Sequence, residues 1–568
     1  MKRDLARLVD QTFDLVVIGG GIHGACVAWD AALRGLSVAL VEQRDFGHAT
    51  SANSLKIIHG GLRYVQDANL GRVRTMLEER STWLRIAPHL VHVLPCLMPT
   101  FDQLSRSKAA LSVALAINEL MAYGRNEPAD WQRRFPPGRI ISRSECLSLL
   151  PGLAPTGVTG GAVWHDAQIY NSERLLLSLV LSAAEAGAAV ANYVQATGFI
   201  YERENVGGVK AKDVLSGQEV EIRGRVVVNS TGAWTDAILR LLGGHARAPR
   251  FPLSIAMNLV TRQILPDYAV GLPARLAGKD GAGNGREPLQ MLFIVPWRNY
   301  SLIGTVHRPY TGAPEAFTVP EALIEDMLIA VNRAYPPAEL QRDDVCHVHA
   351  GFLPTTPGHG SAGQVKLMRA GRVHDHLRED HIGGLITVVG VKYTTARKVA
   401  EKAVNLAVER LGRRARPCQT QGVPIWGGQI NRFDDFRARA ITTRSLGLGP
   451  QTIDHLAYSY GSEYGQILDY VEEDSAWGRP LTTSVPVIRA EIVHAIRSEM
   501  AYTLADVILR RTELGAGGRP DDTCLQACAD LMAAELGWEP ARTNQEIANV
   551  LAAFPAVGRK PLVSMEVT

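Results

Sequence analysis

A glycine-rich turn near the N-terminus constrains the fold more than any other feature of the chain. The run Phe13 to Ile18 (FDLVVI) predicts a short buried strand, and it leads directly into the hexapeptide GGGIHG at 19–24. A helical apolar pattern follows as far as Gly35, and a second strand over 37–41 ends at Glu42. Strand, GxGxxG turn, helix, strand and acid together indicate a dinucleotide-binding βαβ unit.

The glycines of this turn have separate physical tasks. Gly19 permits the tight turn, Gly21 lets the backbone approach a pyrophosphate, and Gly24 lets helix and strand pack closely. The free N–H groups and positive dipole end of the helix attract phosphate, and Glu42 favours a free ribose over a 2′-phosphate. The nucleotide contacts expected here are Gly19, Gly21, Ile22, His23, Gly24, Glu42 and Gln43.

The length and composition indicate a multidomain globular enzyme. A chain of 568 residues predicts roughly three or four domains. With 46% hydrophobic and 21% charged residues, the composition is that of a globular protein. The net charge of only +3 creates no overall electrostatic field that would favour binding of nucleic acid.

The seven cysteines lack zinc-ligand spacing, so we expect no metal and a reducing, cytoplasmic compartment. Cys524 and Cys528 share a helical face, so they could be two small half-buried residues or a redox pair. The charged N-terminus is unlike a signal peptide, and no run of 18 apolar residues predicts a membrane span.

The order of predicted elements divides the chain into three parts. We expect a discontinuous nucleotide-binding domain at 1–87, 171–250 and 351–415, a substrate domain at 88–170 and 251–350, and a helical domain at 416–568. Alternating runs at 291–296 and 300–305 predict an antiparallel sheet, and 219–228 resembles a hairpin. A surface loop is expected at 278–285, and the longest helix at 487–511. The other helices are expected at 69–87, 108–123, 171–187, 318–334 and 394–411, with strands at 188–194 and 385–390.

Several longer motifs resemble the FAD-dependent glycerol-3-phosphate dehydrogenase family, essentially from end to end. They are FDLVVIGGGIHGACVAWDAALRGLSVALVE, ATSANSLKIIHGGLRYVQ, VVNSTGAWTD, SLIGT, GVKYTTARKVAE and EMAYTLADVILRRTELG. The resemblance implies an α/β fold with a glutathione-reductase-type FAD-binding Rossmann domain, an antiparallel substrate sheet and a C-terminal helical domain. It also implies bound FAD, a phosphorylated polyol substrate and a quinone-type acceptor at a membrane surface. We further expect the FAD to be noncovalent and the protein to attach to the inner face of the membrane.

In the same resemblance, three further segments reach the cofactor. The loop after Glu42 would run along the pyrophosphate and isoalloxazine. A turn of small residues would let the end of a strand approach the cofactor, and a strand-to-helix turn would present N–H groups to the flavin. The residues concerned are Thr50, Ser51, Ser54, Lys56, Ile58, Thr231, Gly232, Gly390, Lys392, Tyr393 and Thr394.

The reaction requires a base for the hydroxyl proton and cations for an anionic substrate. His59, His307 and His349 are candidate bases because histidine titrates near neutral pH, although His59 could equally be a core histidine. Lys392 and Arg63 would orient the substrate and stabilise the developing oxyanion, and the arginine fork suits a phosphate. The expected substrate contacts are Arg63, Tyr64, Arg369 and Leu353.

Two positions depart from the family pattern. Leu353 stands where the family has the arginine of Gly-Val-Arg-Pro, and His307 follows Gly304-Thr305-Val306 where the family has an aspartate. We therefore expect a less polar pocket wall and a donor that differs in fit from glycerol 3-phosphate. A different hydroxy or amino donor, or a flavoprotein without catalysis, are the alternatives.

The helix at 108–123 bears on membrane attachment. It has a wide apolar face with Arg106 and Lys108 before it, so it could lie in a membrane interface or pack against its own domain. A homodimer is a further expectation.

Overall fold

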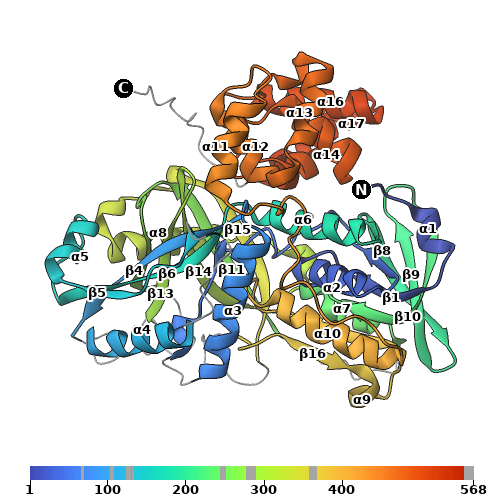
Figure 1. Ribbon diagram of the computed structural model, residues 1–568, viewed down its shortest axis with the longest axis horizontal. Coiled ribbons are helices and arrows are strands. Elements are labelled where there is room, and N and C mark those ends of the chain that lie inside the picture. The colour runs from blue at the N-terminus through green and yellow to red at the C-terminus, as the bar shows by residue number, and fades with distance from the viewer. Residues whose placement is uncertain are drawn as a thin grey trace.

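The chain folds around two sheets, with a group of helices above them (Figure 1). This is a computed structural model, and it describes residues 1–65, 69–102, 108–122, 130, 133–243, 251–276, 289–356 and 367–554, without the side chains of residues 63 and 65. The surface loop expected at 278–285 lies outside these residues.

The first sheet has its parallel strands in the order β17-β10-β1-β2-β7, with β16 antiparallel at the edge beside β17. The central strand β1 is wholly buried, as expected for a parallel sheet covered on both faces. The strands are β1 (Phe13–Ile18), β2 (Val38–Val41), β7 (Ala189–Ala191), β8 (Val194–Glu202), β9 (Asn205–Asp213), β10 (Glu219–Asn229), β16 (Arg372–Asp375) and β17 (Leu385–Val389).

The hairpin expected at 219–228 is wrong, because β10 is one continuous strand. Its first half pairs antiparallel with β9 and its second half pairs parallel with β1. Gly224 is no turn: a Cβ there would lie 2.5 Å from the Val16 side chain, so glycine lets the two strands approach. The strand expected at 188–194 is likewise two strands, since β7 ends before β8 begins.

The second sheet follows the order β15-β11-β14-β13-β12-β4-β6-β3, with β5 beside β6. It is antiparallel except where β12 runs parallel to β4. Its strands are β3 (Ile57–Ile58), β4 (Val91–Phe101), β5 (Arg139–Ile141), β6 (Val158–Ile169), β11 (Leu253–Arg262), β12 (Ala269–Arg275), β13 (Leu289–Trp297), β14 (Tyr300–Tyr310) and β15 (Val345–Pro354).

Helices α2, α6 and α10 pack together against one face of the first sheet, and they share one hydrophobic core with it. The helices of the first 415 residues are α1 (Leu5–Val9), α2 (Ile22–Leu33), α3 (Leu70–Ile86), α4 (Lys108–Ala122), α5 (Arg143–Leu149), α6 (Ser172–Glu185), α7 (Thr235–Arg240), α8 (Glu321–Ala334), α9 (His376–Asp380) and α10 (Ala396–Leu411). Those expected at 69–87, 108–123, 171–187, 318–334 and 394–411 are therefore confirmed to within a few residues.

The helical part of the chain, α11 to α17, lies above α6 at the top of Figure 1. The long helix expected at 487–511 is wrong. The chain leaves the helix at Met500, whose φ is +57°, and re-enters at Thr503, which caps the next turn by accepting from the Asp506 N–H. The elements are α11 (Phe433–Thr443), α12 (Pro450–Tyr460), α13 (Gly465–Glu473), α14 (Arg489–Glu499), α15 (Leu504–Asp506), a π-helical turn (Val507–Arg511), α16 (Asp522–Leu536) and α17 (Pro540–Ala552).

Within the described residues, none of the helices has both the length and the apolar character required to cross a bilayer.

Candidate functional site

The turn between β1 and α2 has the geometry that a pyrophosphate site requires. Gly19 has φ +103°, and a Cβ on Gly24 would lie 1.8 Å from the Gly19 carbonyl oxygen. Gly21 has no side chain to cap α2, and Ser51 accepts the Ile22 N–H, so the following N–H groups of the first turn can face a ligand. The Glu42 carboxylate accepts the Gly20 N–H at 2.7 Å, which holds the acid against the turn, and Gln43 follows it at the end of β2.

A second turn, after β17, meets this one. A Cβ on Gly390 would lie 2.1 Å from the His23 ring, so glycine is required where the two turns touch. Burial lowers the pKa of His23 to about 4, and its Nε2 and the Ser230 hydroxyl are buried with no hydrogen-bond partner among the described residues. Two buried polar groups without a described partner, beside the start of α2, fit a polar ligand across the carboxyl ends of the strands.

The loop at 50–56 lies between the turn and the second sheet. The Thr50 hydroxyl donates to the Phe352 carbonyl at 3.1 Å and accepts the Phe352 N–H at 2.9 Å. Ser51 accepts the Ile22 N–H at 3.0 Å, and Ser54 accepts the Lys56 N–H at 3.1 Å. The loop is thus joined to both α2 and β15.

Two residues expected along the cofactor point elsewhere. The Lys56 ammonium donates to the Ser172 hydroxyl at 2.6 Å and to the Glu173 carboxylate at 3.0 Å, and the Ile58 side chain lies in the hydrophobic core. Only their backbones remain for a cofactor contact.

The small-residue turn after β10 is also open. Thr231 donates its hydroxyl to Asn229 Oδ1 at 2.7 Å, and Gly232 has φ +57° with no atom near its missing Cβ. A ligand can approach the backbone closely here.

His59 lies beside a carboxylate that orients its ring. Its Nδ1 is 3.5 Å from Asp166 Oδ2, and its side chain is 45% exposed. The His59 N–H donates to the Thr394 hydroxyl at 3.2 Å, which joins it to the turn carrying Lys392. Burial raises the pKa of Asp166, but its bonds to His59 and the nearby Arg80 outweigh burial and lower that pKa. The result is an accessible imidazole held by an ionised acid, an arrangement suited to proton transfer.

A basic cavity opens between α3, α10 and the turn after β17. It has a volume of about 140 Å³, and its charged lining residues are all cations. Lys392 also donates to the Tyr64 hydroxyl, and the Arg72 guanidinium lies 4.1 Å from the centre of the Tyr64 ring. The charged residues of the lining are Arg72, Arg369, Lys392, Lys398 and Lys402. This cavity suits an anion such as a phosphate group. The Arg63 side chain lies outside the described part of the chain.

The two other candidate histidines share one face of the second sheet. Ala256 pairs with Gly351 on one side and with His307 on the other, so these three residues point the same way. Gly351 faces the loop at 50–56, since a Cβ there would lie 2.9 Å from Thr50. His349 and Leu353 flank Gly351 at two-residue spacing and therefore face that loop as well.

Of the three candidate bases, His59 combines a 45% exposed side chain with a neighbouring carboxylate. His349 is 3% exposed, and burial together with the charge of Lys56 lowers its pKa well below the ordinary value. His307 is half-buried and lies two strands away from Gly351, or about 10 Å.

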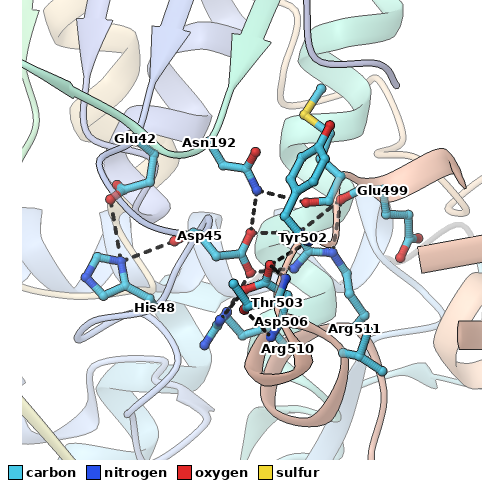
Figure 2. A network of polar contacts seen from close by, with 12 residues as sticks. Glu42, Asp45, His48, Asn192, Glu499, Tyr502, Thr503, Asp506, Arg510 and Arg511 are labelled. Carbon is cyan, nitrogen blue, oxygen red and sulfur yellow. Dashed lines mark hydrogen bonds and ion pairs between the residues drawn. The ribbon is translucent and has the colours of Figure 1, made fainter. Parts of the chain in front are cut away.

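A buried ion network ties the loop after Glu42 to the helical domain (Figure 2). Arg511 contacts Asp45 with two nitrogens, each at 2.7 Å, and Arg510 contacts the same carboxylate at 2.5 Å. The Arg511 guanidinium also donates to the Glu499 carbonyl at 2.9 Å. His48, three residues beyond Asp45, has Nδ1 3.5 Å from the Glu42 carboxylate.

The sequence did not single out Asp166, Arg72, Lys398 or Lys402. Asp166 is one acid within an apolar strand, and only the fold brings it to His59. Lys398 and Lys402 are four residues apart on α10, and that spacing on the helix after Lys392 is the signal that could have indicated a basic face.

Comparison with known proteins agrees with this site. Residues 14–392 match the family model described as FAD dependent oxidoreductase. Residues 418–543 match the model described as the C-terminal domain of alpha-glycerophosphate oxidase. Together with the open turns, these matches define the class of the protein as an FAD-dependent oxidoreductase.

Relatives across nearly the whole chain define the family more narrowly. The chain is 32% identical to a glycerol-3-phosphate dehydrogenase of Synechocystis sp., with 90% of each chain covered. It is also 32% identical to glycerol-3-phosphate dehydrogenase 2 of Mycobacterium tuberculosis, with 97% of this chain and 89% of the relative covered. The chain belongs to the FAD-dependent glycerol-3-phosphate dehydrogenase family.

The crystal structure of a Bacillus halodurans glycerol-3-phosphate dehydrogenase in complex with FAD has the same fold. It superposes with a TM-score of 0.75 at 24% identity and covers 99% of this chain and 98% of its own.

Proposed function

We propose that the protein oxidises the secondary alcohol of glycerol 3-phosphate, or of a closely related polyol phosphate, to the ketone. The observation that carries the proposal is the placement of the basic cavity beside His59. Lys392 lines that cavity, and Thr394, two residues further on, accepts the His59 N–H. The turn that carries Lys392 and Thr394 therefore both lines the anion cavity and contacts the backbone of the candidate base.

The residues would divide the chemistry between binding and proton transfer. FAD supplies the hydride acceptor when bound. Arg369 and Lys398 would hold the phosphate, Lys392 would stabilise charge on the substrate oxygen, and His59 would take the hydroxyl proton while Asp166 holds its ring. The carbinol C–H bond breaks as its hydride leaves, the O–H bond breaks as its proton reaches His59, and the C=O bond forms.

Leu353 favours a donor that is bulkier or less charged at one end than glycerol 3-phosphate. It faces the loop at 50–56 where the family presents an arginine, and a charge-assisted bond is worth about 1.5–3 kcal/mol, or one to two decades in rate. A longer polyol phosphate is the alternative substrate, and Leu353→Arg should improve turnover of glycerol 3-phosphate.

Steady-state kinetics with an artificial electron acceptor test the proposal. We expect glycerol 3-phosphate to exceed glycerol by at least about 100-fold in kcat/KM. We expect Arg369→Met to raise KM about 10-fold or more, with no change for Lys210→Met, which removes an exposed cation on β9. Equal efficiencies for glycerol and glycerol 3-phosphate would contradict phosphate recognition.

A quinone-type acceptor and attachment to the inner face of a membrane extend the proposal, and helix α4 supports the attachment. Leu111 and Leu115 are buried against the domain, but Val113 is 60% exposed and Leu120 79% exposed. Ala116 is exposed on the same face. An outward apolar face on an amphipathic helix suits the interface of a bilayer. Arg106 lies outside the described residues, and the homodimer stays a prediction.

Flotation with anionic liposomes tests the membrane contact. The parent protein should float, and Leu120→Glu should reduce the floating fraction several-fold. Ile329→Glu, at an exposed position of α8, should leave the floating fraction unchanged. A parent protein that stays at the bottom of the gradient at low and high salt would count against attachment.

A further inference from the structure

A compact group of two histidines and an aspartate lies at the outer edge of the first sheet, and none of the three lines the basic cavity. His374 lies on β16, one residue before its end, and His376 and Asp380 are four residues apart on α9, so both helical side chains project from one face. One ligand atom from each residue lies within 4.8 Å of the other two. In Figure 1, β16 and α9 lie at the lower rim of the molecule.

We propose that His374, His376 and Asp380 bind a zinc ion through His374 Nε2, His376 Nδ1 and a carboxylate oxygen of Asp380. Both nitrogens lie 2.7 Å from Asp380 Oδ2. Zinc bonds of about 2.0–2.2 Å in tetrahedral geometry separate neighbouring ligand atoms by about 3.3 Å, so each contact need widen by only about 0.6 Å. Water would complete the coordination.

The remaining ring nitrogens already have the outer partners typical of metal-bound histidines. His376 Nε2 lies 2.8 Å from the Thr387 hydroxyl. His374 Nδ1 lies 3.0 Å from Glu379 Oε1 and 3.3 Å from the Arg372 guanidinium, which itself pairs with Glu379. Such bonds fix the ring orientation and the tautomer so that the other nitrogen is free for a metal. Here both of the other nitrogens point at Asp380.

A hydrogen-bonded histidine–aspartate–histidine chain is the alternative, and His374 Nε2 does form a hydrogen bond of 2.7 Å with Asp380. The orientation of His376 argues against a complete chain. Its Nδ1 is buried with no hydrogen bond among the described residues, although it is 2.7 Å from Asp380. A short contact without hydrogen-bond alignment is what two ligands of one ion would show.

The charge balance favours a cation as well. Glu379 pairs with Arg372, and Asp375 pairs with Arg410. Among the described residues, Asp380 has no lysine or arginine within 4 Å; its ion-pair contacts are the two histidines. Two neutral imidazoles and one carboxylate suit zinc better than magnesium, which prefers oxygen ligands. The bound ion would fix α9 to β16, next to β17.

Zinc uptake by the untagged, FAD-loaded protein tests the site, independently of any substrate. After chelator treatment and equilibration with Zn²⁺, we expect one zinc per chain by mass spectrometry, and a Tm that rises with Zn²⁺ but not with Mg²⁺. Asp380→Asn, of nearly the same shape, should weaken binding by about 100-fold or more and abolish the zinc-dependent rise in Tm. Its FAD content reports whether it folds.

Two control variants make the result specific. His381→Asn changes an exposed histidine next to the site, and Cys524→Ser removes one of two neighbouring thiols on α16; both should still bind one zinc. A parent protein that retains no zinc, or a folded Asp380→Asn variant that binds zinc as tightly as the parent, would overturn the proposal. Loss of zinc in Cys524→Ser would also overturn it, because the thiols would then be the site.

Discussion

At the scale of single residues, the chemistry of the site depends on which ionisable groups are accessible. His349 is buried and neutral, whereas the His59 side chain is 45% exposed and its Nδ1 lies 3.5 Å from the Asp166 carboxylate. The same carboxylate accepts the Gly60 N–H at 2.6 Å. Asp166 therefore fixes both the imidazole and the backbone that carries it, which makes it a positioning residue for the proposed base.

Asp166→Asn should lower kcat by about 10²–10⁴-fold, because general-base catalysis contributes that much and an amide cannot stabilise the imidazolium. Steady-state kinetics on protein with a matched FAD content measure the effect. Glu145→Gln is the control, since it makes the same change of acid to amide in an exposed ion pair with Arg139. An Asp166→Asn enzyme within threefold of the parent would exclude this role.

At the scale of the elements, two glycine turns at the ends of β1 and β17 would form the proposed cofactor site. The first was predictable because local spacing alone specifies it. The second depends on the contact between Gly390 and His23, which are distant in sequence.

Gly390→Ala should lower FAD affinity, because the new methyl group would overlap the His23 ring and push apart two turns that must both approach the cofactor. The ratio of flavin to protein absorbance after gel filtration measures retention. Gly71→Ala is the control, since nothing lies within 4 Å of its missing Cβ. Equal FAD retention by the two variants would show that this contact does not shape the site.

Where the predicted elements were wrong, the apolar pattern continued through a change in the backbone. The residues of 487–511 keep one buried face on both sides of Met500, so periodicity could not reveal the break. The run at 219–228, expected to form a hairpin, is one strand in which Gly224 allows close packing against β1. In both places, tertiary contacts outweigh local preference.

At the scale of the whole molecule, the helical domain is held to the nucleotide-binding sheet by buried charge. Arg510 and Arg511 both reach Asp45 in the loop after β2, and Arg174 of α6 pairs with Glu499 at 2.7 Å. These contacts, like that of Asp166 with His59, join residues that are far apart in the chain. The sequence could therefore indicate several residues of the site, but it could not indicate which of them contact one another.

Arg511→Met should destabilise the protein by about 1.5–3 kcal/mol, because the buried Asp45 carboxylate loses its two charge-assisted bonds from Arg511 while it keeps its contact with Arg510. Thermal or urea unfolding with FAD release measures it. Arg444→Met in the same domain should cost less than about 1 kcal/mol, because its acidic partners are exposed. If both substitutions have the same small effect, the network does not anchor the domain.

The free energy of unfolding should decrease at acidic pH because the buried Glu499 carboxylate becomes protonated. Burial raises its pKa, but Arg174 and His494 outweigh burial and lower the pKa to about 2. Because the folded pKa lies below the ordinary value, the stabilisation is complete above about pH 4.5 and is lost as pH falls towards 2. The loss should be about 3 kcal/mol, and the unfolding free energy of Glu499→Gln should depend less on pH over this range. An unchanged slope in that variant would contradict the assignment.

Anaerobic reduction of the bound flavin tests the central claim most directly. Glycerol 3-phosphate is added to the holoprotein without an electron acceptor, and the oxidised flavin band near ~450 nm is followed. We predict bleaching by glycerol 3-phosphate or a longer polyol phosphate, and no bleaching by glycerol or amino acids at the same concentration. Bleaching by an amino or unphosphorylated hydroxy donor alone, or by no donor in the panel, would contradict the proposal that this flavoenzyme oxidises a polyol phosphate.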